Sequence, residues 1–142
     1  MIGIDTNVLV RFLAQDDEVQ SPIATRFMAR LSRERPGFIS SVVLAEITWV
    51  FARAYKASRD DIANAVEGVL RSAELVVENA DAAYRALGAY QASKSAEFAD
   101  ALIGETAALA GARETVTFDR NAAAETAMRL LHSRVLPQMG AD

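Results

Sequence analysis

The 142-residue sequence predicts an α/β fold, a three-layer α/β/α arrangement around a short central parallel sheet of four to five strands. Two observations indicate this fold. Short apolar segments alternate along the chain with longer segments of helical periodicity, and capping or turn residues lie between them. Because open parallel sheets bind ligands beyond the carboxyl ends of their strands, a functional site is expected among the residues that follow the strands.

Five short apolar segments are the expected strands. Runs of this kind, bounded by turn residues, are typical of strands that are buried in a sheet. The expected strands are Ile2–Asp5, Phe38–Ser40, Leu75–Val77, Thr115–Thr117 and a last strand within Leu130–Leu136. Residues 137–142 follow as a loose tail.

The helices between these strands are indicated by periodicity and by their ends. Proline is favoured at the first helical position, so Ser21 and Pro22 predict the start of a helix that runs to about Arg35, and Gly111 is a C-cap signal. The expected helices are Asn7–Ala14, Ser21–Arg35, Val42–Tyr55 capped by Ser41, one opened by Ser58, Asp81–Lys94, Glu97–Ala110 and Asn121–Met128.

Composition limits the class of protein. With 51% hydrophobic and 24% charged residues, the chain suits one well-buried core, so residues 1–142 are expected to form a single domain. The absence of cysteine excludes disulfides and thiolate ligands. We find no secretory signal and no apolar run of bilayer length, and therefore expect a cytoplasmic protein without a membrane partner. The net charge of −4 requires any contact with nucleic acid to be local.

Four acidic residues are candidates for a shared site. Asp5 closes the first strand and Asp119 follows the fourth, so both are expected at the carboxyl edge of the sheet. Glu46 and Asp100 each lie among apolar residues on one face of a helix, so both should point toward protein rather than water. Taken singly, Asp5 could instead cap the following helix, and Asp119 could be an ordinary turn residue.

A divalent cation is the expected companion of these acids. Carboxylates removed from water repel one another, no lysine lies near them in the sequence, and Mg²⁺ or Mn²⁺ accepts oxygen ligands. Acids and a metal together activate water and stabilise charge on a phosphoryl group, which predicts phosphodiester hydrolysis. The only histidine, His132, lacks the partner that metal-free acid–base cleavage of RNA requires.

Four sequence blocks resemble those of the PIN-domain ribonucleases, and among them the VapC-type toxins of bacterial toxin–antitoxin pairs. The blocks are Asp5–Leu9, Ser40–Glu46, Phe98–Ile103 and Thr117–Asp119, and their order and spacing match over nearly the whole chain. The resemblance implies a PIN-like fold and a Mg²⁺-dependent endonuclease that hydrolyses RNA as the toxin of a VapBC-type pair. It also implies a homodimer and a VapB-type antitoxin, whose tail wraps the toxin and often sends a basic residue into the acid cluster.

The resemblance also assigns roles to residues of this chain. The acidic quartet would be Asp5, Glu46, Asp100 and Asp119, of which Asp5 and Asp100 would be the most direct ligands of the metal. The other two would hold a water or a second ion. The polar residues that resemble those orienting the carboxylates or the attacking water are Thr6, Asn7 and Thr117. Glu97 stands where many relatives carry Asp, and its longer arm suits a rim position.

Arginine is better suited than lysine to bidentate phosphate contacts. The arginines in segments near the predicted rim are expected to contact RNA phosphates, and they are Arg11, Arg53, Arg59 and Arg120. Three aromatic residues, Trp49, Phe51 and Phe98, are expected to pack in the core rather than to stack on bases.

Two alternative functions are weighed against the nuclease. The first is a metal-dependent phosphatase with Asp5 as nucleophile, which is disfavoured because position 7 is Asn rather than Asp and no lysine lies near Asp119. The second is a PIN-like domain outside toxin systems that binds or processes RNA. The presence of all four acids argues against a domain that has lost its activity.

Overall fold

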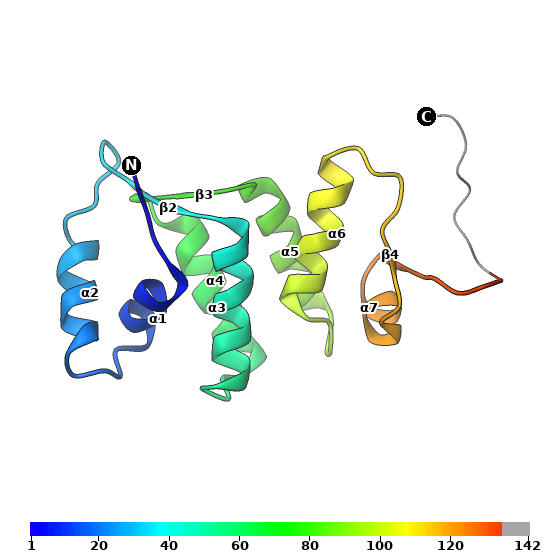
Figure 1. The fold of residues 1–142 in the computed structure, drawn as a ribbon, viewed down its shortest axis with the longest axis horizontal. Helices are drawn as coiled ribbons and strands as arrows, with labels where there is room; N and C mark the ends of the chain where they lie inside the picture. The colour runs from blue at the N-terminus through cyan, green and yellow to red at the C-terminus, as the bar shows by residue number, and fades with distance from the viewer. Residues whose placement is uncertain (135–142) are drawn as a thin grey trace.

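The computed structural model describes residues 1–134, and Figure 1 shows an elongated molecule with α1 and α2 at one end and β4 and α7 at the other. In chain order the elements are β1 (Ile2–Gly3), α1 (Thr6–Ala14), α2 (Gln20–Met28), β2 (Gly37–Ile39), α3 (Ser41–Arg53), α4 (Arg59–Arg71), β3 (Leu75–Val77), α5 (Ala80–Ala92), α6 (Phe98–Leu109), β4 (Val116–Thr117), α7 (Arg120–Glu125) and β5 (Arg129–Leu130). None of these helices could span a bilayer, since the longest have 13 residues.

The strands are short and parallel, as predicted, but among the described residues they form two separate sheets. In the first sheet, β2 lies between β1 and β3, with Gly37 paired to Ile2 on one side and to Leu75 on the other. The second sheet pairs β4 with β5, aligning Val116 with Arg129. The outer edge of β1 therefore has no neighbouring strand within residues 1–134.

The main core lies between the three-stranded sheet and the helices α1 and α3 to α6. Its most buried side chains include Ile39 of β2 and Leu44 and Ile47 of α3, which are fully excluded from solvent. The buried face of α5 carries three alanines besides Leu87 and Tyr90, and these small side chains allow α6 to pack closely along it. This packing determines where the N-terminus of α6 lies.

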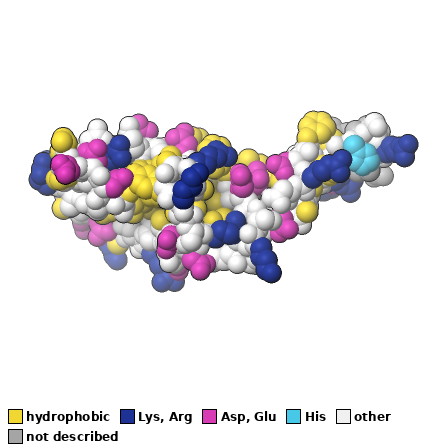
Figure 2. All heavy atoms as spheres, turned by 90° about the horizontal axis from the view of Figure 1, so that it is seen from below, with side chains coloured by type: hydrophobic (Ala, Val, Ile, Leu, Met, Phe, Trp, Pro, Cys, Tyr) yellow, Lys and Arg dark blue, Asp and Glu magenta, His cyan; other side chains and the backbone are white. Residues whose placement is uncertain are grey.

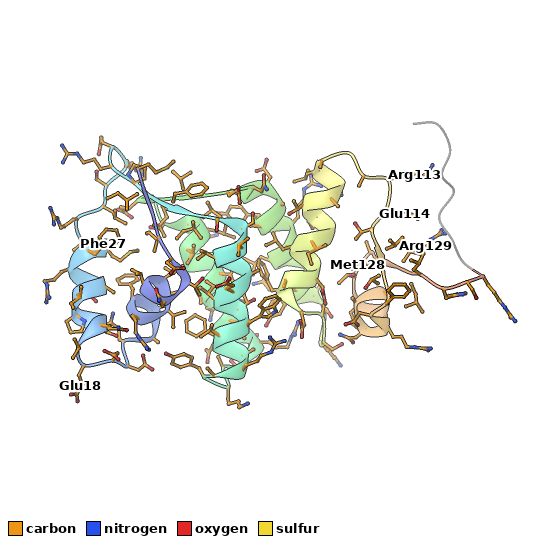
Figure 3. All side chains as sticks on the ribbon, in the orientation of Figure 1. Glu18, Phe27, Arg113, Glu114, Met128 and Arg129 are labelled. Carbon is orange, nitrogen blue, oxygen red and sulfur yellow. The ribbon has the colours of Figure 1, made fainter. Side chains whose placement is uncertain are left out.

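The β4–α7–β5 segment packs mainly on itself. Ala122 and Met128 are buried outside the main core, and Glu114 forms an ion pair of 3.2 Å with Arg129 (Figure 3). The segment contacts the loop between α5 and α6 through Asn121, whose Nδ2 donates to the Ser95 carbonyl oxygen at 3.0 Å. This polar contact holds the segment against the rest of the domain, while Ala122 and Met128 stay outside the main core.

The helix α2 differs most from its prediction, which placed its start at Ser21 and its end near Arg35. It starts one residue earlier and ends at Met28. Asp17 supplies the acceptor for the first helical N–H groups, since its Oδ1 receives Gln20 N–H at 2.6 Å. The Ser21 hydroxyl donates instead to the Arg11 carbonyl oxygen at 2.8 Å, so a tertiary contact replaces the predicted cap.

The remaining boundaries differ by smaller amounts. Ser40 rather than Ser41 caps α3, accepting Val43 N–H at 3.1 Å, whereas Ser58 caps α4 as predicted. The strand β3 has the predicted bounds. Gly111 has a positive φ of 97° just after α6, consistent with the predicted C-cap. Of the predicted last strand, Leu130–Leu136, the described part is observed as β5, Arg129–Leu130; its last two residues and the whole predicted tail lie outside the described residues.

Gly37 provides a test of the packing between the sheet and its neighbours. A Cβ added there would lie 2.5 Å from Ile4 Cδ1 and 3.0 Å from Leu75 Cδ2. We expect Gly37→Ala to lower the free energy of unfolding by about 1–3 kcal/mol, because the core would be overpacked. Gly68→Ala is the matched control, since its Cβ would meet nothing within 4 Å and should raise helix stability by roughly 0.5–1 kcal/mol. Urea unfolding measures both, and an unchanged midpoint for Gly37→Ala would contradict this packing.

Candidate functional site

The carboxyl end of β1 brings together two of the predicted acids. Asp5 follows β1 and caps α1, with its Oδ1 accepting Thr6 N–H at 2.8 Å. The Thr6 hydroxyl donates to Glu46 Oε2 at 2.7 Å and so links α1 to α3. Thr6 is buried, which makes its hydroxyl a fixed donor for the Glu46 carboxylate. One residue thus connects the Asp5–Glu46 pair.

Glu46 lies at the border of the buried face of α3. Leu44 and Ile47 occupy the centre of that face, and Glu46 is half-buried beside it. Of its neighbours one turn away, Val43 and Val50 pack against the core, whereas Val42 is 65% exposed and Trp49 is 40% exposed. The prediction that Glu46 points into an apolar stripe is therefore only partly right, because the stripe ends at this residue.

A cavity of about 450 Å³ opens beside the Asp5–Glu46 pair. Asn7, Arg11 and Tyr55 contribute to its lining together with the two acids. Asn7 is exposed in the first turn of α1, in keeping with its predicted place beside the carboxylates. The cavity is large enough for a hydrated ion or a phosphate group.

The start of α6 holds a second group of acids. Asp100 lies in the first turn of this helix and is half-buried, and Glu97 occupies the N-cap position without a side-chain capping bond. Burial raises the pKa of Asp100, and the negative charges of Glu97 and Asp119 raise it further. Ile103, one turn further along α6, is 55% exposed, so Asp100 also lies at the border of a buried face.

Asp119 belongs to this second group and also caps α7. Its Oδ1 accepts Ala122 N–H at 2.9 Å, so Asp119 is a helix cap, whereas the structural alternative for this residue was an ordinary turn and the cap was expected of Asp5. Its own N–H donates to the Thr117 hydroxyl oxygen at 3.0 Å, so Thr117 fixes the backbone that carries the carboxylate. Asp119 thus combines a local structural role with an electrostatic effect on Asp100.

The four predicted acids therefore lie in two groups, the Asp5–Glu46 pair and the Asp100–Asp119 pair. Within residues 1–134, no three acidic or histidine side chains are arranged to hold one metal ion. The donor atoms are carboxylate and hydroxyl oxygens, which are the ligands that Mg²⁺ and Mn²⁺ prefer. The donor chemistry fits a hard divalent cation, and the sharing of one ion by all four acids requires the two groups to approach.

The predicted phosphate-binding arginines are in different situations. Arg53 and Arg120 are exposed. Arg11 is engaged, because its Nε donates to Gln20 Oε1 at 2.8 Å and it lies 3.7 Å from Asp16 Oδ1. Figure 2 shows Lys and Arg side chains interspersed with Asp and Glu on the visible face, without a continuous basic surface.

Arg59 is held in place by the protein. Its Nη2 donates to the carbonyl oxygens of Tyr90 at 3.0 Å and Ser93 at 3.3 Å, and its guanidinium lies 4.0 Å from the centre of the Tyr90 ring. These contacts fix the C-terminal end of α5 against α4. The geometry gives Arg59 a structural role, and its contact with RNA phosphates stays a prediction.

Sequence reasoning missed two features of this region. Glu78 directly follows β3, and its Oε1 accepts Ser41 N–H at 2.9 Å at the start of α3. The rule that polar residues follow parallel strands could have found it. Trp49 was expected in the core and is 40% exposed, whereas Phe51 and Phe98 are buried as predicted. Helical spacing indicates a face but not how much of it a neighbouring element covers.

The short parallel strands and their connecting helices define an α/β domain. Acids from remote segments of the chain form its candidate site. The PIN domain family matches residues 2–127, and the chain belongs to this family. A VapC ribonuclease from Aquifex aeolicus (strain VF5) is 28% identical over 117 residues, which cover 82% of this chain and 86% of that protein. The four sequence blocks that resembled PIN-domain ribonucleases all lie within the matched residues.

Replacing Asp100 tests the electrostatic cost of the second acid group. The pKa of Asp100 is raised in the folded state, so its ionised carboxylate lowers the free energy of unfolding at neutral pH. This destabilisation disappears when the pH falls below the pKa that Asp100 has in the unfolded chain. In buffer with a chelator, Asp100→Asn should raise Tm at pH 7 by roughly 1–4 °C. The gain should shrink toward pH 4.

Glu18→Gln is the control for this substitution, because Glu18 is exposed at the far end of the molecule (Figure 3). It should leave Tm nearly unchanged at both pH values. A Tm for Asp100→Asn that falls at pH 7 would contradict the repulsion among these carboxylates.

Proposed function

We propose that this chain is a metal-dependent ribonuclease that hydrolyses RNA phosphodiester bonds with Asp5, Glu46, Asp100 and Asp119. The observation that carries the proposal is the link between Asp5 and Glu46 through Thr6, which holds two acids from remote segments at one end of β1. Membership of the PIN domain family and the similarity to a protein named VapC ribonuclease support the same chemistry.

The four acids and the neighbouring hydroxyl provide oxygen ligands for Mg²⁺ or Mn²⁺. Asp5 and Asp100 would be direct ligands, as the resemblance to the PIN-domain ribonucleases implies. A bound ion of this type lowers the pKa of a water and stabilises negative charge on a phosphate. It also offsets the repulsion that raises the pKa of Asp100.

The protein's own residues position the groups around the reacting phosphate. Thr6 fixes one oxygen of Glu46 and leaves the other available to accept a proton from the attacking water. Thr117 orients the backbone of Asp119, and Asn7 adds a polar side chain to the rim of the cavity beside Asp5. Glu97 contributes negative charge at the rim without contacting the phosphate.

We further propose a toxin role, with a VapB-type antitoxin and a second copy of the chain as partners. The support is the similarity to the VapC ribonuclease and the exposed apolar residues beside the acids, Val42 of α3 and Ile103 of α6. Apolar side chains that border an active site are suited to contact another protein. Co-expression with a VapB-type protein should give a complex that does not cleave RNA.

Replacement of the acids tests the ribonuclease proposal. Asp5→Asn and Asp100→Asn should each lower the rate of cleavage of a labelled single-stranded RNA by more than the roughly 10–100-fold typical for residues that only orient a ligand. Addition of a chelator should abolish cleavage by the unmodified chain. Glu18→Gln should cleave at the unmodified rate.

The same assay on small phosphate esters separates the alternatives. Turnover of esters but not RNA would favour the phosphatase, and binding of RNA without any cleavage would favour a binding domain. Either result would contradict the proposed nuclease.

Thr6 tests whether the orientation of Glu46 matters for the reaction. Thr6→Val keeps the shape of the side chain but removes the hydroxyl that donates to Glu46 Oε2. We expect kcat to fall by about 10-fold with little change in KM, since second-shell partners typically contribute 10–100-fold. Thr6→Ser restores the donor and should recover most of the activity. Equal kcat values for the Val variant and the unmodified chain would exclude a positioning role for Thr6.

A further inference from the structure

Trp49 and Arg53 form an exposed pair on α3 that the acidic site does not use. The Arg53 Cζ lies 5.5 Å from the centre of the Trp49 ring, and the ring is 40% exposed. Large aromatic residues usually lie in the core or at an interface, so an exposed indole beside a cation indicates a binding surface.

The pair lies one turn along α3 from Glu46. Trp49 follows Glu46 by three residues on this helix. A cavity of about 260 Å³ extends from Trp49 and Arg53 to Glu97, the N-cap residue of the helix that carries Asp100. A ligand in this cavity would therefore lie beside residues that neighbour both acid groups.

The walls of the cavity are well ordered by internal contacts. Arg59 is fixed by two backbone carbonyl oxygens and by the Tyr90 ring, and Phe98 is fully buried behind it. Because Arg59 is engaged in this way, Arg53 is the lining arginine whose charge faces an incoming ligand. The cavity thus combines a flat aromatic ring with one available cation.

We propose that the Trp49–Arg53 pair binds single-stranded RNA next to the scissile bond, with an unpaired base stacked on Trp49 and the adjoining phosphate on Arg53. The inference rests on the proposed ribonuclease function and names the form of its substrate. Stacking on an aromatic ring accepts any base but requires that the base be unpaired. The net charge of −4 makes a local cation such as Arg53 necessary for phosphate binding.

Trp49 is the only tryptophan of the chain, so its fluorescence reports directly on this surface. The Asp100→Asn variant is titrated with a single-stranded oligoribonucleotide and, separately, with a duplex of the same sequence. The fluorescence anisotropy of end-labelled RNA measures the binding affinity independently. We expect saturable quenching by the single strand, weaker quenching by the duplex, and a loss of affinity of about 3-fold between 50 and 200 mM salt, as one phosphate contact implies.

Substitutions in the cleaving enzyme provide the second readout. Trp49→Ala should raise KM for single-stranded RNA by about 10-fold with kcat nearly unchanged, and Trp49→Phe should retain most of the affinity. Arg53→Ala should reduce the slope of log affinity against log salt by about one. The matched controls are Tyr84→Ala and Arg85→Ala, an exposed aromatic and an exposed arginine on α5, and neither should change KM.

The outcomes separate this inference from the proposed function. Cleavage of RNA with no change in Trp49 emission, or equal quenching by duplex and single strand, would overturn the stacking site while the nuclease stands. Quenching by the single strand without any cleavage by the unmodified chain would support the stacking site and overturn the nuclease.

Discussion

Repulsion among carboxylates is the constraint on which the candidate site depends. At Asp100 burial raises the pKa most, and the charges of Glu97 and Asp119 raise it further. Thr6 stabilises the two carboxylates of the other pair, since its backbone N–H donates to Asp5 and its hydroxyl donates to Glu46. The fold thus holds acids from four segments near the ends of strands and helices, where a divalent cation is the group that would let them approach.

The candidate metal site needs negative charge, whereas the proposed RNA-binding surface needs positive charge. A chain with a net charge of −4 repels a polyanion at long range, so attraction must come from individual exposed arginines near the acids. We propose Arg53 for this role, whereas Arg59 at the start of α4 donates to carbonyl oxygens of the fold. Whether an arginine of this chain is available to a ligand therefore depends on the hydrogen-bond acceptors that surround it.

The sequence was sufficient for features that depend on local chemistry. The Ser58 cap, the bounds of β3 and the positive φ at Gly111 follow from nearest neighbours and were predicted. The start of α2 was wrong because Ser21 bonds to Arg11, a contact between two helices that periodicity does not reveal. The division of the strands into two sheets and the exposure of Trp49 likewise depend on distant segments of the chain.

The central proposal is that Asp5 and Asp100, one from each acid pair, bind the same divalent ion. Calorimetric titration of Mn²⁺ into the unmodified chain, Asp5→Asn, Asp100→Asn and the double variant tests it most directly. Ligands of a common ion are strongly coupled, so each single variant should lose most of the affinity and the double variant should lose little more. Losses that simply add, or an affinity that neither substitution changes, would contradict a shared ion.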